Sequence, residues 1–358
     1  MPQRSLFENA ADIIPQPVKK NMSVSELIRF MGKSSFESRN VYKGATLYQR
    51  MIDDNDTIWL GIAGAGIAGG MGGMVITLLQ SGFIDVICST GAQVYHDLHF
   101  AFDLPVKAIS PHWDDNILRA HGDTRIYDIG IREEETMEMQ DQIICDFVKE
   151  EYDKLSGKEI SSWEFNYLLG LWTLKKAKYP QRSFTAEAAG QGVPIFWDSL
   201  SNHSIAMNLM KMEKEGYPVQ ISASADIFDS AAIAYSASET GFVELGGGGP
   251  KNFIQQTGPT ISQILNIDFE GADRGLQIST AVEREGSLSS CTFDEAVTWG
   301  KYKATDDTRL VQVWGEYSVI FPLISAYVID ECQPRTAKNI IAKMDEYRKV
   351  LDKNYSKK

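Results

Sequence analysis

Lys301 is the residue whose surroundings point most directly to chemistry. The stretch 292–301 surrounds one amine with apolar side chains, those of Phe293, Ala296, Val297 and Trp299. Burial among apolar groups disfavours the charged form of a lysine and makes the amine a better nucleophile. An ordinary solvated lysine at the end of a helix is the alternative, since most lysines are exposed.

Three glycine-containing turns follow predicted strands and precede predicted helices. They lie at residues 64–69, at Gly91 and at residues 246–249. A helix that starts at such a turn presents backbone N–H groups to a phosphate. Three turns of this kind favour nucleotide binding, although a glycine that only lets a helix pack on a sheet is the alternative at each.

Thr90 and Gly91 end one of these strands, where open parallel sheets bind ligands. We therefore expect both near a cofactor, with a plain helix start that uses Asp97 as the alternative.

Strands and helices alternate along most of the chain with short connections. Strands are expected at 57–62, 84–90, 194–197, 217–222, 242–245, 276–280 and 310–313. Helices are expected at about 38–52, 71–80, 203–214, 225–238, 319–330 and 336–352. This pattern predicts an α/β fold with a doubly wound, mostly parallel, Rossmann-like sheet and peripheral helices.

The expected division has three parts. Residues 1–55 form an N-terminal arm with helices, the first of them started by the capping-box sequence 23–26. Residues 56–335 form the catalytic α/β domain, with a helical insertion at about 100–180, and residues 336–358 form a C-terminal helix.

Composition excludes several classes of function. The 358 residues hold 35 basic and 48 acidic side chains, a net charge of −13, which argues against a nucleic-acid partner. No stretch approaches the ~20 apolar residues that span a bilayer, so no membrane partner is expected. The four cysteines are far apart, which favours a reduced cytoplasmic protein with no metal site.

Four separated motifs resemble those of the deoxyhypusine synthase family. They are DEAVTWGK at 294–301, LGGGGPKN at 245–252, STAVE at 279–283 and SVIFPL at 318–323. With weaker matches near 58–97 and 193–202, the resemblance covers most of residues 40–330. It implies an NAD-dependent aminobutyl transferase of the EC 2.5.1 type that acts on polyamines.

The resemblance also implies a mechanism. A hydride passes to NAD from the carbon beside an amine nitrogen of spermidine, and Lys301 attacks the resulting imine. A four-carbon amine stays on Lys301 as an enzyme imine until an acceptor amine takes it. Trp299 would pack against the polyamine, and Glu295 would pair with an ammonium group or shuttle a proton. The alternatives are a core tryptophan and a first-turn helix charge.

The NAD contacts carried over by position include glycines for close backbone approach and acidic side chains for ribose hydroxyls. They are Gly64, Thr90, Gly91, Gly246, Gly247, Gly248, Thr280, Glu285 and Glu316. The family further implies a homo-oligomer, a tetramer, with sites at subunit interfaces.

Several positions depart from the protein-modifying members of the family. His96 replaces an acidic residue, Asn252 an active-site histidine and Asn202 a cofactor-side aspartate. Two aspartates that hold the polyamine align with Met207 and Leu288. The usual substrates therefore cannot be assumed.

Other polar residues offer replacements for the lost anchors. Asp97, Asp198, Glu283 and Glu285 could bind ammonium groups from new angles, and Asn202 and Asn252 would face the substrate. His96 would serve as a general base near neutral pH, or else as a structural hydrogen-bonding residue.

These departures favour the deoxyhypusine synthase-like branch, with a small diamine such as putrescine as acceptor and homospermidine as product. A lysine on a translation factor is the alternative acceptor. A catalytically silent NAD or polyamine binder is a second hypothesis, and a plain NAD dehydrogenase is a third.

Overall fold

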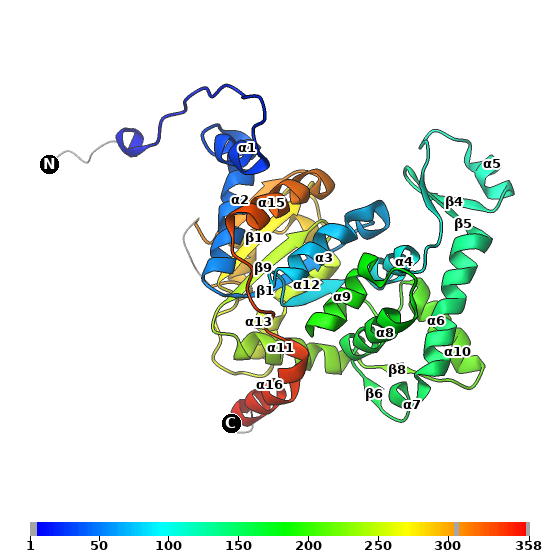
Figure 1. Cartoon of the computed structure of the whole chain (residues 1–358). Helices are drawn as coiled ribbons and strands as arrows, with labels where there is room; N and C mark the ends of the chain where they lie inside the picture. Colours follow the sequence, from blue (N-terminus) through cyan, green and yellow to red (C-terminus); the bar gives the residue numbers. More distant parts are fainter. Residues whose placement is uncertain (1–5, 304–307, 356–358) are drawn as a thin grey trace.

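A six-stranded parallel sheet forms the centre of the fold (Figure 1). The computed structural model describes residues 6–303 and 308–355. The strand order is β11-β10-β9-β1-β2-β7, and every neighbouring pair is parallel. The strands are β1 (Thr57–Ile62), β2 (Val86–Ser89), β7 (Ile195–Trp197), β9 (Thr240–Leu245), β10 (Arg274–Ser279) and β11 (Leu310–Trp314). The chain adds strands first on one side of β1 and then on the other, which is the predicted doubly wound arrangement.

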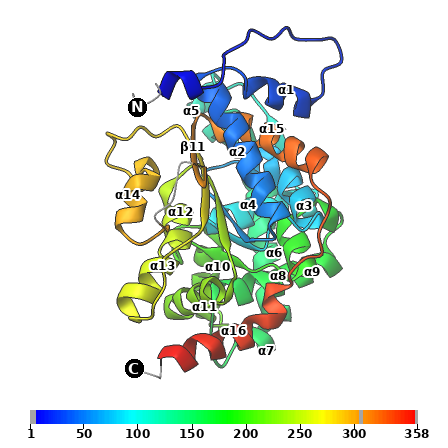
Figure 2. The same ribbon diagram turned by 90° about the vertical axis from the view of Figure 1, so that its left-hand side faces the viewer.

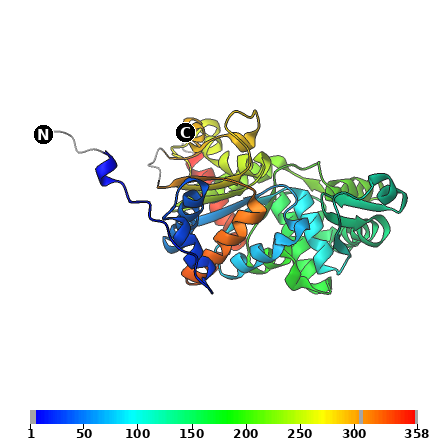
Figure 3. The same cartoon turned by 90° about the horizontal axis from the view of Figure 1, so that it is seen from above.

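Helices cover both faces of this sheet (Figure 3). One core, which includes Ile58 and Leu60, lies under α2 (Phe36–Asp53), α3 (Gly72–Gln80) and α15 (Tyr317–Glu331). The other, which includes Trp59 and Phe242, lies under α11 (Ala223–Ser236), α12 (Gly248–Gln255) and α16 (Ile340–Tyr355). Because successive strand residues point to opposite faces, β1, β2, β7 and β9 contribute side chains to both cores.

The remaining helices surround this centre. They are α1 (Val24–Met31), α4 (Gly91–Ala101), α5 (Asp115–Ala120), α6 (Met139–Glu150), α7 (Tyr152–Leu155), α8 (Ser162–Lys176), α9 (Phe184–Gln191), α10 (Ser204–Lys214), α13 (Thr257–Pro259) and α14 (Phe293–Thr298). The capping box predicted at Ser23 and Glu26 is confirmed at the start of α1. None of the described helices is both long and apolar enough to cross a membrane.

The N-terminal segment extends away from the body, as Figures 1 and 2 show. Residues 10–15 and 17–21 are exposed, including Ile13, Ile14 and Val18. By contrast, α1 and α2 pack against α15.

The insertion at 100–180 differs from the helical prediction. It contains a small antiparallel sheet in the order β3-β5-β4, made of β3 (Val106–Ala108), β4 (Asp123–Ile126) and β5 (Ile129–Arg132). This sheet projects from the body at the end opposite the N-terminal segment (Figure 3). Its strands have three or four residues and little alternation of apolar and polar side chains, so periodicity could not reveal them.

The strand predicted at 217–222 also differs. Only β8 (Gln220–Ile221) forms there, and it pairs with β6 (Glu159–Ile160) outside the main sheet.

Candidate functional site

Two glycine turns meet at the carboxyl edge of the sheet, where the strand order reverses. Gly64 follows β1 and Gly246 follows β9, and both have φ of +75°. Tyr317 packs against both turns, because its hydroxyl donates to the Ala63 carbonyl at 2.8 Å and accepts from the Gly66 N–H at 3.0 Å. A Cβ on Gly246 would lie 3.0 Å from the Tyr317 ring, so this position requires glycine both for its φ and for space.

Tyr317 is a residue that the motifs did not identify. It stands directly before the SVIFPL segment, and that position was its only signal.

A cavity of about 230 Å³ lies beside these turns. Five of the predicted NAD contacts line it, namely Gly246, Gly247, Thr280, Glu285 and Glu316. Among the residues that the structure describes, no side chain forms a capping hydrogen bond at the start of α12, which begins after Gly247, so its first N–H groups can donate to an anion. Glu316 is held at the start of α15, where one of its oxygens accepts from the Ser318 N–H at 2.8 Å.

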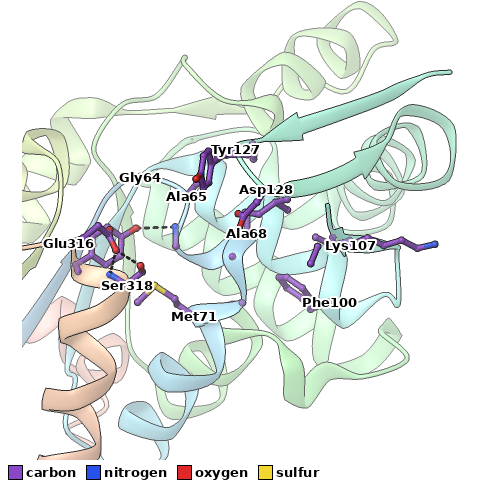
Figure 4. A pocket seen from close by; sticks show the side chains of 18 residues that line it. Gly64, Ala65, Ala68, Met71, Phe100, Lys107, Tyr127, Asp128, Glu316 and Ser318 are labelled. Carbon is purple, nitrogen blue, oxygen red and sulfur yellow. Dashed lines mark hydrogen bonds between the residues drawn. The ribbon is translucent and has the colours of Figure 1, made fainter. Parts of the chain in front are cut away.

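Tyr317 also lines a larger cavity of about 660 Å³, which Figure 4 shows. Gly64 and Glu316 line it from the main α/β domain. Lys107, Tyr127 and Asp128 line it from the small antiparallel sheet and its turn. The insertion therefore reaches the carboxyl edge of the main sheet, which the sequence did not indicate.

Packing explains two other glycines of the predicted cofactor site. A Cβ added to Gly91 would lie 2.4 Å from the His203 ring. A Cβ added to Gly248 would lie 2.3 Å from the Leu288 Cβ. Thr90 caps α4 by accepting from the Gln93 N–H at 3.3 Å. These contacts fit the alternative in which glycine lets elements pack closely.

Asp198, a predicted substrate residue, lies against the first turn of α12. A Cβ on Gly249 would lie 2.0 Å from the Asp198 Oδ2, so the carboxylate sits over the first turn of that helix. Burial raises the pKa of Asp198, and its Oδ1 is buried with no hydrogen-bond partner among the described residues. Asn202 is exposed in the turn that follows.

Lys301 is fixed by its backbone and by one side-chain contact. Its N–H donates to the Ala296 carbonyl at 3.1 Å, and its carbonyl accepts from the Ala272 N–H at 3.0 Å. Its Nζ donates to the Oδ1 of Asn252 at 3.0 Å. Asn252 is a residue of α12, so this contact brings the amine to the helix that begins with the glycine run.

The apolar residues around Lys301 are arranged differently from the prediction. Phe293 and Ala296 are buried in the core, but the Trp299 side chain is 64% exposed and Lys301 itself is half-buried. Glu295 is exposed in the first turn of α14. Within one chain these side chains therefore do not enclose the amine.

Asp97 does not fit the predicted substrate-binding role. It is fully buried, and its carboxylate accepts from the N–H groups of Phe184 at 2.9 Å and Thr185 at 3.0 Å, and from the Ser183 hydroxyl. Burial raises the pKa of Asp97 to about 6, although these donors oppose the effect. The side chain stabilises the start of α9 and has no surface toward a ligand.

His96 faces a second histidine on the same helix. Its Nδ1 lies 3.0 Å from the His99 Nε2, and the His99 Nδ1 lies 3.2 Å from the Gln140 Oε1. Burial lowers the pKa of both rings, that of His99 to about 3. These contacts fit the structural alternative for His96.

Comparisons with known proteins agree on one family. A family model described as deoxyhypusine synthase matches residues 26–328. A "Deoxyhypusine synthase-like protein" of Nostoc punctiforme is 34% identical over 353 residues, 96% of this chain and 89% of that protein. A "Probable deoxyhypusine synthase 2" of Methanosarcina mazei is 35% identical over 307 residues, 86% of each chain.

A crystal structure assigned to the deoxyhypusine synthases, from Entamoeba histolytica, shares the fold. It has a TM-score of 0.58 and 16% identity, over 89% of this chain and 97% of the other.

Proposed function

Because the chain belongs to the deoxyhypusine synthase family, we propose that it is an NAD-dependent aminobutyl transferase with Lys301 as covalent carrier. The family implies a transferase. The observation that supports Lys301 is its hydrogen bond to Asn252 on α12. Through that helix the amine is held close to the glycine turn that we propose for the cofactor.

The residues at the carboxyl edge fit a dinucleotide. The turn at Gly246 and Gly247 and the uncapped start of α12 suit a pyrophosphate, and Glu285 and Glu316 offer carboxylates to ribose hydroxyls. When bound there, NAD would supply the acceptor and later the donor of a hydride.

In this proposal Lys301 attacks the imine carbon of an oxidised polyamine, the bond from that carbon to the donor's nitrogen breaks, and the rest of the donor leaves as a free amine. The four-carbon amine stays on Lys301 in imine linkage. Asn252 orients the Lys301 amine. An acceptor amine then attacks the same carbon, and the lysine amine leaves. Trp299 and Glu295 are exposed beside Lys301, and we propose that a second subunit of a homo-oligomer covers them and completes the substrate site.

We favour a small diamine as the acceptor, with homospermidine as the product from putrescine. The support is that Met207 and Leu288 stand where the protein-modifying members carry aspartates that hold the polyamine. Both side chains are uncharged, and they are 60% and 53% exposed. Asp198 remains as a carboxylate at the edge of the sheet. A translation-factor lysine is the alternative acceptor.

Product analysis tests the proposal. The purified protein is incubated with NAD and either putrescine alone or spermidine with putrescine, and free triamine is measured. We expect homospermidine from the wild type and from Lys214→Arg, an exposed lysine that serves as control, and none from Lys301→Arg.

Other outcomes identify the alternatives. Free NADH with an oxidised product would indicate a dehydrogenase. NAD binding without turnover would indicate a silent binder, and labelling of a protein substrate alone would indicate deoxyhypusine synthesis.

A further inference from the structure

A layer of polar side chains is buried between the main sheet and α12. Glu244 on β9 and Gln277 on β10 are 1% and 0% exposed, and Lys251 and Gln255 face them from the helix. The central strands of a parallel sheet are normally apolar, and buried polar groups need partners. Glu244 has its partners inside the layer, because its Oε1 accepts from the Gln255 Nε2 and from the Tyr302 hydroxyl, both at 2.8 Å. Lys251 and Gln277 also bind the chain outside it.

Lys251 and Gln277 hold the main chain of the loop at residues 282–291. The Lys251 Nζ donates to the Cys291 carbonyl at 2.6 Å, and the Gln277 Nε2 donates to the Ser289 carbonyl at 2.6 Å. The two side chains also bind each other, since the Lys251 Nζ donates to the Gln277 Oε1 at 2.9 Å. Residues from two different elements, α12 and β10, therefore fix the same end of the loop.

The loop at residues 282–291 is buried only at this anchored end. Residues 282–288 are exposed, whereas Ser290 is 5% exposed and Lys251 is 3% exposed. Exposed loops open at a low cost in free energy, so hydrogen bonds from buried donors to the main chain decide where such a loop lies. Lys251 and Gln277 supply bonds of this kind.

The anchored end of the loop lies on the first turn of α12. A Cβ added to Gly248 would lie 2.3 Å from the Leu288 Cβ and 3.0 Å from the Ser289 nitrogen. The loop therefore fills the space that a side chain at Gly248 would need. From there it lines the cavity of about 230 Å³ beside the turn at Gly246 and Gly247.

Ser290 connects the anchored end of the loop to Glu285. Its hydroxyl lies 2.6 Å from the Glu285 carbonyl oxygen and 2.7 Å from the Ser287 carbonyl oxygen, and it can donate to either. Glu285 in turn lines the same cavity as Gly246 and Gly247. The position of the Glu285 carboxylate therefore depends on where the loop is held.

We propose that Lys251 and Gln277 are positioning residues for the cofactor, which hold the loop at residues 282–291 against α12 so that Glu285 faces the cavity. Without these bonds the loop would open, and the Glu285 carboxylate would leave the place where a ribose hydroxyl is expected. The inference deepens the proposed function and rests on it for the identity of the ligand. It assigns a task to two buried polar side chains that the covalent mechanism itself does not use.

Limited trypsin digestion measures the position of the loop without NAD. Arg284 is exposed in the loop, and cleavage after it requires the loop to open. Gln277→Leu removes one anchor and an acceptor of the other, so cleavage after Arg284 should become about tenfold faster. Lys251→Met removes the other anchor and should act in the same direction. Cleavage after the exposed Lys20 is the internal reference and should keep its wild-type rate.

Calorimetry of NAD binding separates positioning from a general loss of structure. Gln277→Leu should weaken NAD binding about tenfold, and Glu285→Gln should weaken it by a similar factor. Because Gln277 acts through Glu285, adding Gln277→Leu to Glu285→Gln should cost much less affinity than it costs the wild type. A general loss of structure would weaken binding by the same factor in both backgrounds.

Gln140→Leu is the matched control, because Gln140 is also a fully buried glutamine but lines neither cavity. It should leave both the cleavage after Arg284 and the affinity for NAD unchanged. If Gln277→Leu does not fold, Gln277→Glu decides, since it keeps the size of the side chain and the acceptor of Lys251 but loses the donor to Ser289.

Two results would overturn the inference. They are unchanged cleavage after Arg284 in both anchor variants, and equal losses of NAD affinity with and without Glu285→Gln. Faster cleavage in the variants of a protein that binds no NAD as wild type would refute the proposed function only. NAD binding and aminobutyl transfer by the wild type, with cleavage unchanged in the variants, would refute this inference only.

Discussion

Replacing Asp97 with alanine distinguishes its structural role from the substrate-binding role that the sequence suggested. The carboxylate is fully buried and accepts from the N–H groups of Phe184 and Thr185. Each buried donor left unpaired costs about 1–3 kcal/mol, and the small cavity adds to this, so the loss should be about 3–5 kcal/mol. The unfolding midpoint should then fall by about 6–10 °C.

Thermal unfolding by circular dichroism measures this loss, with Asp146→Ala as the control. Asp146 is exposed on α6, so its replacement should change stability by no more than about 0.5 kcal/mol. The reasoning would be refuted if Asp97→Ala unfolded at the wild-type temperature but required much more amine substrate for half-maximal activity.

Three further predictions concern pH, the amine and the cofactor. Burial raises the pKa of Asp226 from 3.8 to about 7, so its contribution to stability is complete below pH 3.8 and is lost as the pH rises through 7. In Asp226→Asn, the fall in the free energy of unfolding between low and high pH should be smaller by up to about 4 kcal/mol, whereas the exposed Asp268→Asn should keep the wild-type fall. Denaturation curves at pH 4 to 8 measure this free energy. Asn252→Ala removes the acceptor of the Lys301 amine and should lower kcat/KM about tenfold while NAD affinity, by calorimetry, is unchanged. Gly246→Ala forces a side chain into a φ of +75° and should weaken NAD binding about tenfold in the same assay, and unchanged affinity would argue against that turn.

Hydrophobic periodicity and turn chemistry were sufficient to predict the main sheet. Thr57–Ile62 forms β1 with the predicted bounds, and β9 and β10 lie within two residues of theirs. These strands are buried on both faces and therefore have continuous apolar sequences bounded by polar or glycine residues. The short strands of the insertion have no such pattern, because they have only three or four residues and pair with one another outside the main sheet.

The candidate site could be proposed from sequence where one residue type has few uses. Glycine turns after predicted strands pointed to Gly64 and Gly246, which both have a φ of +75°, and the family motif pointed to Lys301. Asp97 could not be assigned from sequence, because the donors that hold it come from a segment 86 to 88 positions away. Glu244 was equally hidden, since only the fold shows that Lys251, Gln255 and Tyr302 surround it.

The central claim is that Lys301 carries the transferred group, and chemical trapping tests it most directly. The protein is incubated with NAD and spermidine, reduced with borohydride, digested and analysed by mass spectrometry. The account predicts a four-carbon amine adduct on Lys301 that requires NAD. Formation of free triamine with Lys301 unmodified at every time point, or an adduct confined to another lysine, would contradict it.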